Sequence, residues 1–318
     1  MTISVIIPIY NTSEALRPTV KSLLAQTFQD FEVVFVDDGS TDNSADICRE
    51  YCAADPRFRL IQQANQGPAG SRNTGMAHAK GDFFYFLDSD DAIHPRMLEL
   101  LLKTYRESDG NFSMCLFKMV DRLPDSYDEP QTDVVSVARD EMLESMFSRS
   151  GRDLPYMVLW NKLYPRQLLE GLTIKEIVSE DTEFNLRVYL RCQKAAVLQT
   201  PLYYYLQHNQ SVTHQDVAGR RIRELDTYHL MLNELPQDHK VARAACIRKL
   251  YMKILNVRYL AKGTDKEQDA KQKIRSLKKA TWKQMISNSA LNWKNKSIIV
   301  LLYLFPKVYQ LFFDYNNK

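Results

Sequence analysis

The fold of this chain is decided by one apolar stretch that ends in acids, Phe83-Phe84-Tyr85-Phe86-Leu87-Asp88-Ser89-Asp90-Asp91. The apolar and aromatic run is too short for a buried helix, so it predicts a strand that is covered on both faces in the middle of a sheet. The carboxylates that follow repel one another, and burying them without partners would be costly. They indicate a divalent cation with oxygen ligands beside a phosphate-bearing ligand, because Mg²⁺ commonly combines one or two carboxylates with substrate phosphates. The alternative is an acidic turn that caps a helix beginning near Pro95.

Other strand-like runs precede this one and alternate with helical segments. We expect strands at Ile3–Ile9, Phe31–Val36 and Phe58–Gln62, and helices at Ser44–Ala54 and Pro95–Arg106. This alternation predicts a mainly parallel sheet with helices on both faces. Ligands of such sheets bind beyond the carboxyl ends of the strands. Asp37 and Asp38 follow the second strand, so they are expected at the same edge as the acids after the fourth.

The second half of the chain predicts a different alternation. We expect a fifth strand at Asn111–Val120, a helix at Arg139–Phe147, and two short strands at Ala196–Leu198 and Leu202–Leu206 that return to the sheet. From Val217 onward the pattern is helical.

Composition describes a globular chain with two electrostatically different parts. Of the 318 residues, 45% are hydrophobic and 25% charged, which is typical of a soluble protein. The net charge is +3, but the stretch from Gly219 onward holds 21 Lys and Arg against 8 Asp and Glu, so the preceding body is acidic. The basic residues lack a motif that reads DNA or RNA, which argues against a nucleic-acid partner.

Cysteine usage and the N-terminus predict a reducing, cytoplasmic location. The five cysteines are scattered and odd in number, so they do not form a disulfide framework. The start of the chain lacks the basic region and cleavage site of a signal peptide, and no apolar run is long enough for a spanning helix.

The end of the chain has two interpretations. The segment Ser297–Phe313 is apolar and aromatic but is interrupted by Pro306 and Lys307, and it follows cationic helices. Such a pattern fits a segment lying in the interface of an anionic membrane, here the inner face of the cytoplasmic membrane. The alternative is a helical subdomain that packs on the body with a solvated basic face.

Three separated motifs together resemble the family 2 glycosyltransferases of the GT-A fold. They are Val5–Asn11, Val36–Asp42 and Leu87–Asp91, in that order and spacing. The resemblance is close over about residues 1–110 and looser over 155–215. It implies an α/β fold of GT-A type, a mainly parallel doubly wound sheet, at residues 1–215. Residues 1–110 would form the nucleotide-binding half, 111–215 the acceptor-binding half, and 216–318 a basic helical C-terminal region.

The resemblance also implies roles for residues of the donor site. Members of the family transfer a sugar from a nucleotide diphosphate, usually with inversion and with Mn²⁺ or Mg²⁺. Asp88-Ser89-Asp90 matches the DxD motif, with Asp90 as the direct metal ligand, Asp88 near the ribose or metal, and Asp91 as support or helix cap. Further donor-binding positions are Pro8, Tyr10, Asn11, Asp37, Asp38 and Arg72, with Tyr10 against the base, Asp38 at a uracil-like ring edge and Arg72 toward the phosphates. An Arg on a surface turn is the alternative for Arg72.

Glu180-Asp181 resembles the family's ED motif, whose Asp is the catalytic base. An acceptor hydroxyl must lose its proton as it attacks the anomeric carbon, and a carboxylate can take that proton. The alternative is helix capping, with Ser179 as the N-cap and the two acids in the first turn.

Two further segments match the family loosely. Trp160, Asn161 and Lys162 resemble a segment near the acceptor or donor sugar, although a buried core Trp is an equal alternative. His208 and Ser211 resemble a lid that closes on the diphosphate, where His208 could also contact the metal, or be a solvated loop histidine.

We therefore expect a metal-dependent, inverting hexosyl- or N-acetylhexosaminyltransferase that uses a nucleotide-diphosphate sugar, with UDP preferred. The implied acceptor is a glycan or lipid-linked glycan in cell-surface polysaccharide synthesis. The alternatives are a nucleotidyltransferase of similar fold and a nucleotide-sugar-binding protein that has lost catalysis. A nucleotidyltransferase is expected to have a Gly-rich phosphate-binding loop directly after the first strand. This chain has Pro8-Ile9-Tyr10-Asn11 there, which argues against that alternative.

Overall fold

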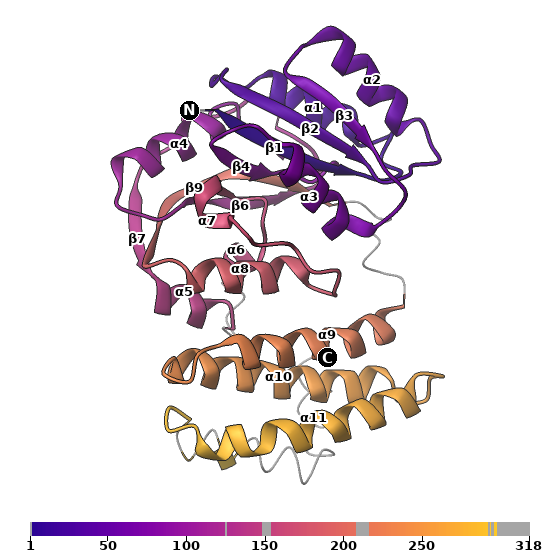
Figure 1. Ribbon diagram of the computed structural model, residues 1–318, viewed down its shortest axis with the longest axis vertical. Helices are drawn as coiled ribbons and strands as arrows, with labels where there is room; N and C mark the ends of the chain where they lie inside the picture. The colour runs from indigo at the N-terminus through magenta and orange to yellow at the C-terminus, as the bar shows by residue number, and fades with distance from the viewer. Residues whose placement is uncertain are drawn as a thin grey trace. The chain divides into compact units, whose positions relative to one another are not determined.

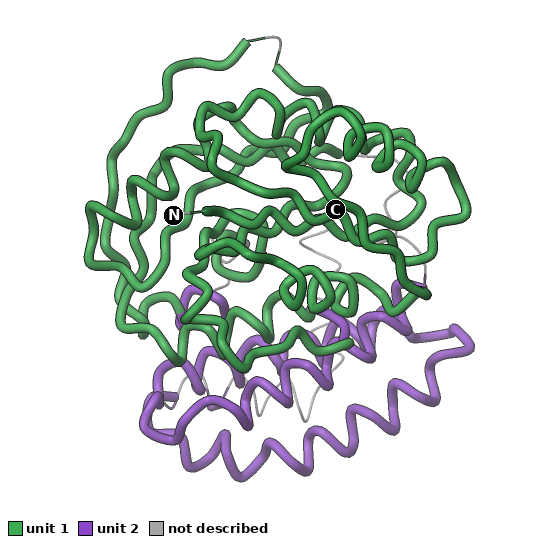
Figure 2. The backbone as a smooth tube through the Cα atoms, turned by 45° about the horizontal axis from the view of Figure 1, so that its top comes forward, with its two compact units in different colours: residues 1–142, 154–176, 180–211 green, residues 143–153, 177–179, 212–318 purple. Residues whose placement is uncertain are grey.

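The computed structural model describes residues 2–124, 126–147, 154–207, 216–291, 293 and 296–297. They form two compact units, each coloured separately in Figure 2. Unit 1 comprises residues 1–142, 154–176 and 180–211, and unit 2 comprises 143–153, 177–179 and 212–318. All of the sheet belongs to unit 1.

The first half of unit 1 alternates strands with helices, as the sequence predicts (Figure 1). Its elements are β1 (Ile3–Ile9), α1 (Leu16–Leu24), β2 (Phe31–Asp37), α2 (Ser44–Ala54), β3 (Phe58–Gln62), α3 (Gly67–His78), β4 (Phe83–Phe86), β5 (Ala92–Ile93) and α4 (Met97–Glu107). β1 pairs in parallel with β2 and β4, and β2 pairs in parallel with β3. The carboxyl ends of four strands therefore meet at one edge.

The second half adds antiparallel strands and brings the sheet to nine. Its elements are β6 (Ser113–Val120), β7 (Val134–Ala138), α5 (Arg139–Ser145), α6 (Leu154–Met157), β8 (Lys162–Pro165), α7 (Arg166–Leu169), α8 (Glu180–Leu190) and β9 (Lys194–Leu206). The strand order is β3-β2-β1-β4-β8-β6-β9-β5, with β7 on β9. Because β8 is antiparallel to β4, its first residue lies toward the carboxyl end of β4.

Alternate residues of β1 pack against helices on opposite faces of the sheet. Ile3, Val5 and Ile7 belong to a core cluster with the apolar faces of α1 and α4. Ile6 points the other way, where Gly75 of α3 comes so close that a Cβ there would lie 2.3 Å from the Ile6 side chain. Successive side chains of a strand point to opposite faces of the sheet, and helices cover both faces here, so the run needs apolar residues on both faces. The predicted fold class, a mainly parallel sheet with helices on both faces, is confirmed.

Unit 2 is built from helices. They include α9 (Val217–Glu234), α10 (Lys240–Leu260) and α11 (Glu267–Ser287), which pack through apolar side chains such as Leu225, Ile247 and Leu277. Within this unit the buried Glu224 accepts from Lys253 and from Arg221, and the hydroxyl of Ser179 donates to it at 3.5 Å. The predicted C-terminal helical region is therefore present. No helix within the described ranges is both long and apolar enough to cross a bilayer.

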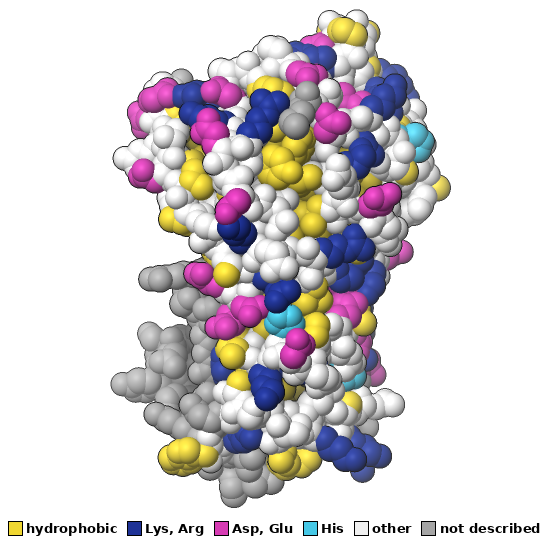
Figure 3. All heavy atoms as spheres, turned by 60° about the vertical axis from the view of Figure 1, so that its left-hand side comes forward, with side chains coloured by type: hydrophobic (Ala, Val, Ile, Leu, Met, Phe, Trp, Pro, Cys, Tyr) yellow, Lys and Arg dark blue, Asp and Glu magenta, His cyan; other side chains and the backbone are white. Residues whose placement is uncertain are grey.

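Charges of both signs are interspersed on the face drawn in Figure 3, and hydrophobic side chains lie there in small groups. That face therefore carries no extended area of a single sign.

Candidate active site

The loops after β1 and β2 hold each other through reciprocal hydrogen bonds. The backbone N–H of Asn11 donates to Ser40 Oγ at 3.1 Å, and Asn11 Oδ1 accepts from the Thr41 N–H at 2.8 Å. Asn11 adopts a left-handed backbone with φ of 51°, which Asn tolerates better than most residues. The preceding Tyr10 is half exposed, at 50%, on this braced loop. The pair of loops thus presents an aromatic ring at the carboxyl edge of the sheet, while Pro8 lies within β1 itself.

The two acids at the end of β2, Asp37 and Asp38, have different hydrogen-bond partners, as expected for adjacent residues at a strand end. Asp37 Oδ1 accepts from the Ser40 N–H at 3.1 Å, and Oδ2 accepts from Gln62 Nε2 at 3.0 Å. Asp38 Oδ1 accepts from Gln63 Nε2 at 2.7 Å and from the Gln66 N–H at 2.9 Å. Both of the hydrogen bonds described for the Asp38 side chain therefore use Oδ1. Asp37 braces the loop, and Asp38 is oriented by the segment that leads into α3.

A further carboxylate, that of Asp42, accepts hydrogen bonds within the loop after β2 and from the loop after β1. Asp42 accepts from the Ser13 N–H at 3.0 Å and from the Ser44 N–H at 2.9 Å. Although burial acts to raise its pKa, the hydrogen bonds from Ser44 and Ser13 prevail and lower it to about 2. Sequence reasoning did not single out a positioning role for Asp42, and its place in the Asp-Gly-Ser-Thr-Asp segment was the available signal.

The acidic turn after β4, residues 88–91, is held in place by hydrogen bonds from α1 and β9. The backbone carbonyl of Ser89 accepts from Thr19 Oγ1 of α1 at 2.9 Å. Asp91 is buried and accepts from the Tyr203 hydroxyl at 2.5 Å and from the Leu206 N–H at 2.8 Å. Burial raises the pKa of Asp91 to about 8, and the charges of Asp88 and Asp90 act in the same direction. Asp91 therefore ties the turn to β9, which fits its predicted role as support.

Arg72 joins this turn to the start of α8. Its Nη2 donates to Asp88 Oδ1 at 2.8 Å, and its Nη1 donates to Glu180 Oε1 at 3.0 Å. The Arg72 side chain is 10% exposed, so the interpretation as a surface Arg on a turn is wrong. Burial acts to lower its pKa, but the charges of Asp88 and Glu180 raise it, which keeps the guanidinium charged. One cation thus gathers two of the predicted site residues, which lie far apart in the sequence.

Asp181 stands beside this group with a different environment. Glu180 forms an ion pair with Arg72. The hydrogen bonds described for Asp181 are with the neighbouring residue, where Oδ1 accepts from the Thr182 N–H at 2.7 Å. Part of its surface is exposed, yet protein atoms crowd the carboxyl. Burial and the charge of Glu180 raise the pKa of Asp181, against the opposing effect of Arg72, to about 7. A carboxyl that titrates near neutrality is suited to general-base chemistry.

The predicted metal site rests on carboxylates that belong to one turn. Among the residues that the structure describes, no three His, Cys, Asp or Glu side chains are grouped so that they could hold a metal ion by themselves. His208, the third predicted ligand, and Ser211 of the predicted lid lie outside the described residues. Asp88 and Asp90 still fit a hard divalent cation, because such ions commonly take one or two protein carboxylates and complete their shell with substrate phosphates and water.

Trp160, Asn161 and Lys162 are packed inside unit 1. Trp160 is 5% exposed and stacks on Tyr203, with ring centroids 4.0 Å apart. Lys162 is fully buried and its Nζ donates to Pro155 O at 2.6 Å, Val158 O at 2.5 Å and Asn161 Oδ1 at 2.8 Å. Burial lowers the pKa of Lys162 to about 7. In this structure the three residues hold the segment before β8 together, and contact with an acceptor stays a prediction.

Two kinds of residue escaped the sequence analysis. Gln63 and Gln66 orient Asp38, and Tyr203 orients Asp91. Glutamines in a turn carry no motif, so nothing in the sequence distinguished the first two. Tyr203 lies in an aromatic run, Tyr203-Tyr204-Tyr205, which predicts a buried strand but not a hydrogen bond to an acid.

Comparisons with known proteins identify the family of the chain. Residues 4–172 match the model of the family described as Glycosyl transferase family 2. The chain is 31% identical over 216 residues to the Bacillus subtilis protein described as putative glycosyltransferase EpsH, covering 66% of this chain and 62% of EpsH. It is 34% identical over 220 residues to glycosyltransferase GlyA from Streptococcus pneumoniae, covering 64% of this chain and 30% of GlyA. The matches thus span less than two thirds of either relative.

Solved structures show the same fold at low sequence identity. Staphylococcus aureus TarS 1–349, solved with UDP-GlcNAc, superposes with a TM-score of 0.68 at 24% identity, covering 85% of this chain and 78% of TarS. The mannosyltransferase PcManGT from Pyrobaculum calidifontis, solved with GDP-Man and Mn²⁺, gives 0.52 at 14% identity, covering 96% of this chain and 87% of that enzyme. The family model spans more than half of the sequence and includes the acidic turn and both braced loops. The chain therefore belongs to glycosyl transferase family 2.

Proposed function

We propose that this glycosyltransferase moves a hexosyl or N-acetylhexosaminyl group from a UDP-sugar to an acceptor hydroxyl with inversion, with Mn²⁺ or Mg²⁺ as cofactor. The observation that carries the proposal is the double hydrogen bond of Arg72, which gathers Asp88 and Glu180 beside Asp181 at the carboxyl edge of the sheet. The UDP-GlcNAc complex of TarS and the GDP-Man and Mn²⁺ complex of PcManGT support the donor class and the cofactor.

The donor would lie across the braced loops and the acidic turn. Tyr10 offers a half-exposed ring to the base, and Asp38, held through Oδ1, directs its second oxygen to a ring N–H of uracil. Arg72 supplies a planar donor to the phosphates. Asp90 and Asp88 would hold the divalent cation, which neutralises the charge that develops on the departing diphosphate.

The reaction itself is a single displacement. Asp181 takes the proton of the acceptor hydroxyl while the hydroxyl oxygen forms its bond to the anomeric carbon. The bond between that carbon and the diphosphate oxygen breaks, and its electron pair leaves with UDP. One base on the side opposite the leaving group suffices, and the configuration inverts. Glu180 positions Arg72 in this scheme.

The proposed acceptor and location are based on the composition of the C-terminal part of the sequence. We propose a glycan or lipid-linked glycan of the cell surface as acceptor and a cytoplasmic protein that associates with the inner membrane face. The support is the basic stretch from Gly219 onward followed by the apolar, aromatic sequence that begins at Ser297. Co-sedimentation of the full chain with liposomes containing phosphatidylglycerol tests this. Association that is lost in phosphatidylcholine liposomes and at high salt supports it, and no association with either lipid rejects it.

The donor and chemistry are tested together by calorimetry and product analysis. UDP, CDP, GDP and their glucose and N-acetylglucosamine conjugates are titrated into the protein with and without Mn²⁺. We expect UDP compounds to bind most tightly and only with the metal, and UDP to be released from the sugar nucleotide on turnover. Binding without any release of UDP would favour a sugar-nucleotide-binding protein that has lost catalysis.

A further inference from the structure

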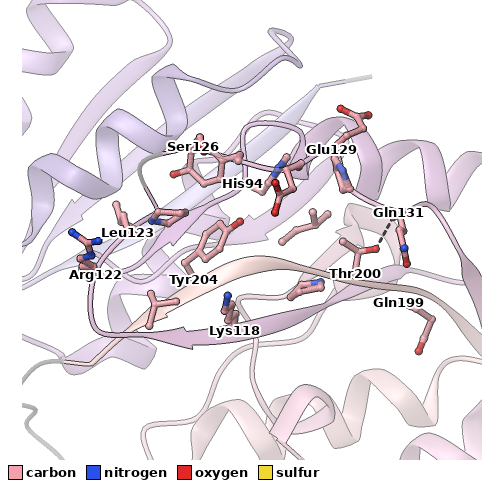
Figure 4. Close-up of a pocket in the computed structure, with 17 residues that line it drawn as sticks. His94, Lys118, Arg122, Leu123, Ser126, Glu129, Gln131, Gln199, Thr200 and Tyr204 are labelled. Atoms are coloured by element: carbon pink, nitrogen blue, oxygen red, sulfur yellow. Dashed lines mark hydrogen bonds between the residues drawn. The ribbon is translucent and has the colours of Figure 1, made fainter.

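A cavity of about 410 Å³ lies in unit 1 away from the donor residues. It lies between the ribbon of β6 and β9 on one side and residues 122–124 and 126–131 on the other, as Figure 4 shows. None of the residues proposed to contact the donor lines it. Its volume falls in the range of small-molecule sites, about 300–1,000 Å³.

The inner wall of the cavity is aromatic. Tyr204 of β9 projects into its middle in Figure 4, beside the labelled His94. The Tyr127 ring packs against both, 5.2 Å from His94 and 5.6 Å from Tyr204 between centroids. His94 is buried and held on both ring nitrogens, with Nδ1 accepting from the Arg96 N–H at 3.1 Å and Nε2 donating to Asp128 O at 3.2 Å. Burial lowers the pKa of His94, so this wall is neutral.

The rim is polar and carries charges of both signs. Gln131 and Gln199 offer amides, Asp128 lines the cavity with Arg122 and Lys118, and Glu129 is ion-paired with Arg96. The Thr200 hydroxyl donates to Gln131 O at 2.6 Å, which fastens the loop to β9. Lys118 lies on β6 facing the cavity and forms no ion pair with any described residue (Figure 4).

We propose that this cavity binds a carbohydrate, as a subsite for the part of an acceptor glycan that lies beyond its reacting sugar. A sugar ring presents an apolar C–H face and a rim of hydroxyls, which match a neutral aromatic wall bordered by amides, carboxylates and an ammonium. A site for phosphate or another anion would instead need a wall of cationic side chains. The assignment rests on the proposed function, because glycosyl transfer is what gives the chain an acceptor glycan.

Strand β9 links the cavity to the acidic turn of the proposed donor site. Leu202 and Tyr204 line it from β9, whereas the intervening Tyr203 faces away and donates to Asp91 of the acidic turn. β5, which directly follows Asp91, pairs with the same stretch, Ala92 opposite Tyr204. A glycan in the cavity therefore contacts the strand that fixes the donor-binding turn.

The test uses the full chain and defined oligosaccharides. Chitotetraose, maltotetraose, cellotetraose and lacto-N-neotetraose are offered to the protein in saturation-transfer-difference NMR, with and without UDP and Mn²⁺. We expect at least one to bind without being displaced by UDP. Tyr127→Ala and Lys118→Ala should each weaken that binding by about tenfold or more. Met119→Ala, a neighbour of Lys118 that alternates to the other face of β6, should leave it unchanged.

Several outcomes overturn the assignment. They are no binding by any of the oligosaccharides, equal binding by Lys118→Ala and the wild type, and displacement of the bound oligosaccharide by inorganic phosphate. Lys118 is exposed, so its variant reports on the cavity even if Tyr127→Ala does not fold. UDP affinity with Mn²⁺ is measured on the same samples. Failure of UDP to bind the wild type would reject the proposed function, whereas intact UDP binding with no oligosaccharide bound rejects the subsite alone.

Discussion

Arg72 Nη2 donates to Asp88 Oδ1 at 2.8 Å, and this hydrogen bond links helix α3 to the acidic turn after β4. Because Nη1 of the same guanidinium donates to Glu180, one side chain fixes the spacing between the acidic turn and the start of α8, the helix that carries Asp181. Its Nε is buried and has no hydrogen-bond partner among the described residues. The guanidinium therefore keeps one N–H donor that is unused in this structure.

Replacing Arg72 tests this bridging geometry. Arg72→Lys keeps the charge but cannot donate to two carboxylates from one planar fork. We expect the affinity for UDP with Mn²⁺, measured by calorimetry, to fall by about tenfold or more. Arg17→Lys is the matched control, because Arg17 forms an exposed pair with Glu50. Equal UDP affinity in Arg72→Lys and the wild type would show that the bridge has no part in donor binding.

The metal role of the acidic turn is tested at Asp90. Asp90→Ala removes a carboxylate from the proposed cation site, and we expect UDP binding to lose its dependence on Mn²⁺ almost completely. Asp46→Ala, which removes an exposed carboxylate from α2, should leave that dependence intact. The measurement is UDP affinity over a series of Mn²⁺ concentrations. An unaltered Mn²⁺ dependence in Asp90→Ala would exclude this residue as a ligand.

The parallel half of the fold was predictable from local pattern, and the antiparallel half was less so. Ile3–Ile9 and Phe58–Gln62 were predicted with the bounds that the structure shows, because buried parallel strands read as continuous apolar runs. β8, at Lys162–Pro165, was missed, since it is short and begins with a buried lysine. The two short strands predicted around Pro201 form one strand, β9. Register shifts on either side of Leu116 of β6 accommodate Pro201, which lacks an N–H, within β9.

The site could be predicted as separate motifs but not as an arrangement. The three motifs at Val5–Asn11, Val36–Asp42 and Leu87–Asp91 each lie at the end of a parallel strand, so the sheet edge that they share could be predicted from strand order alone. The contacts of Arg72 join residues 16 and 108 positions apart, and no local pattern encodes such a pair. The burial of Trp160 also depends on tertiary packing, because the face that it covers belongs to Tyr203 of a distant strand.

The pH dependence of transfer tests Asp181 as the base. Because burial raises its pKa to about 7, the carboxyl is protonated below neutrality and the base is lost there. Transfer at low substrate should therefore rise with pH up to a plateau above about 7 and fall about tenfold per pH unit below it. A profile that stays flat down to about pH 5 would assign the proton to a group of ordinary carboxyl pKa.

Removing the base without changing its shape gives a second test of Asp181. Asp181→Asn should lower transfer by about a hundredfold or more and leave UDP binding with Mn²⁺ unchanged. Glu180→Gln, in contrast, removes a partner of Arg72 and should weaken UDP binding as well. Turnover close to that of the wild type in Asp181→Asn would remove it as the base.

The last prediction separates a packing role of Lys162 from an acceptor contact. Its ammonium donates to three oxygens inside unit 1, and Lys162→Met would leave those oxygens buried without a donor. Each unsatisfied group costs about 1–3 kcal/mol, so we expect the free energy of unfolding in urea to fall by about 3 kcal/mol or more. Lys103→Met, on the exposed side of α4, is the control. UDP affinity of the folded protein should not change, because the hydrogen-bond partners of Lys162 Nζ include none of the residues proposed to contact the donor. Full stability combined with lost transfer would instead indicate that the ammonium leaves its carbonyl partners to contact the acceptor.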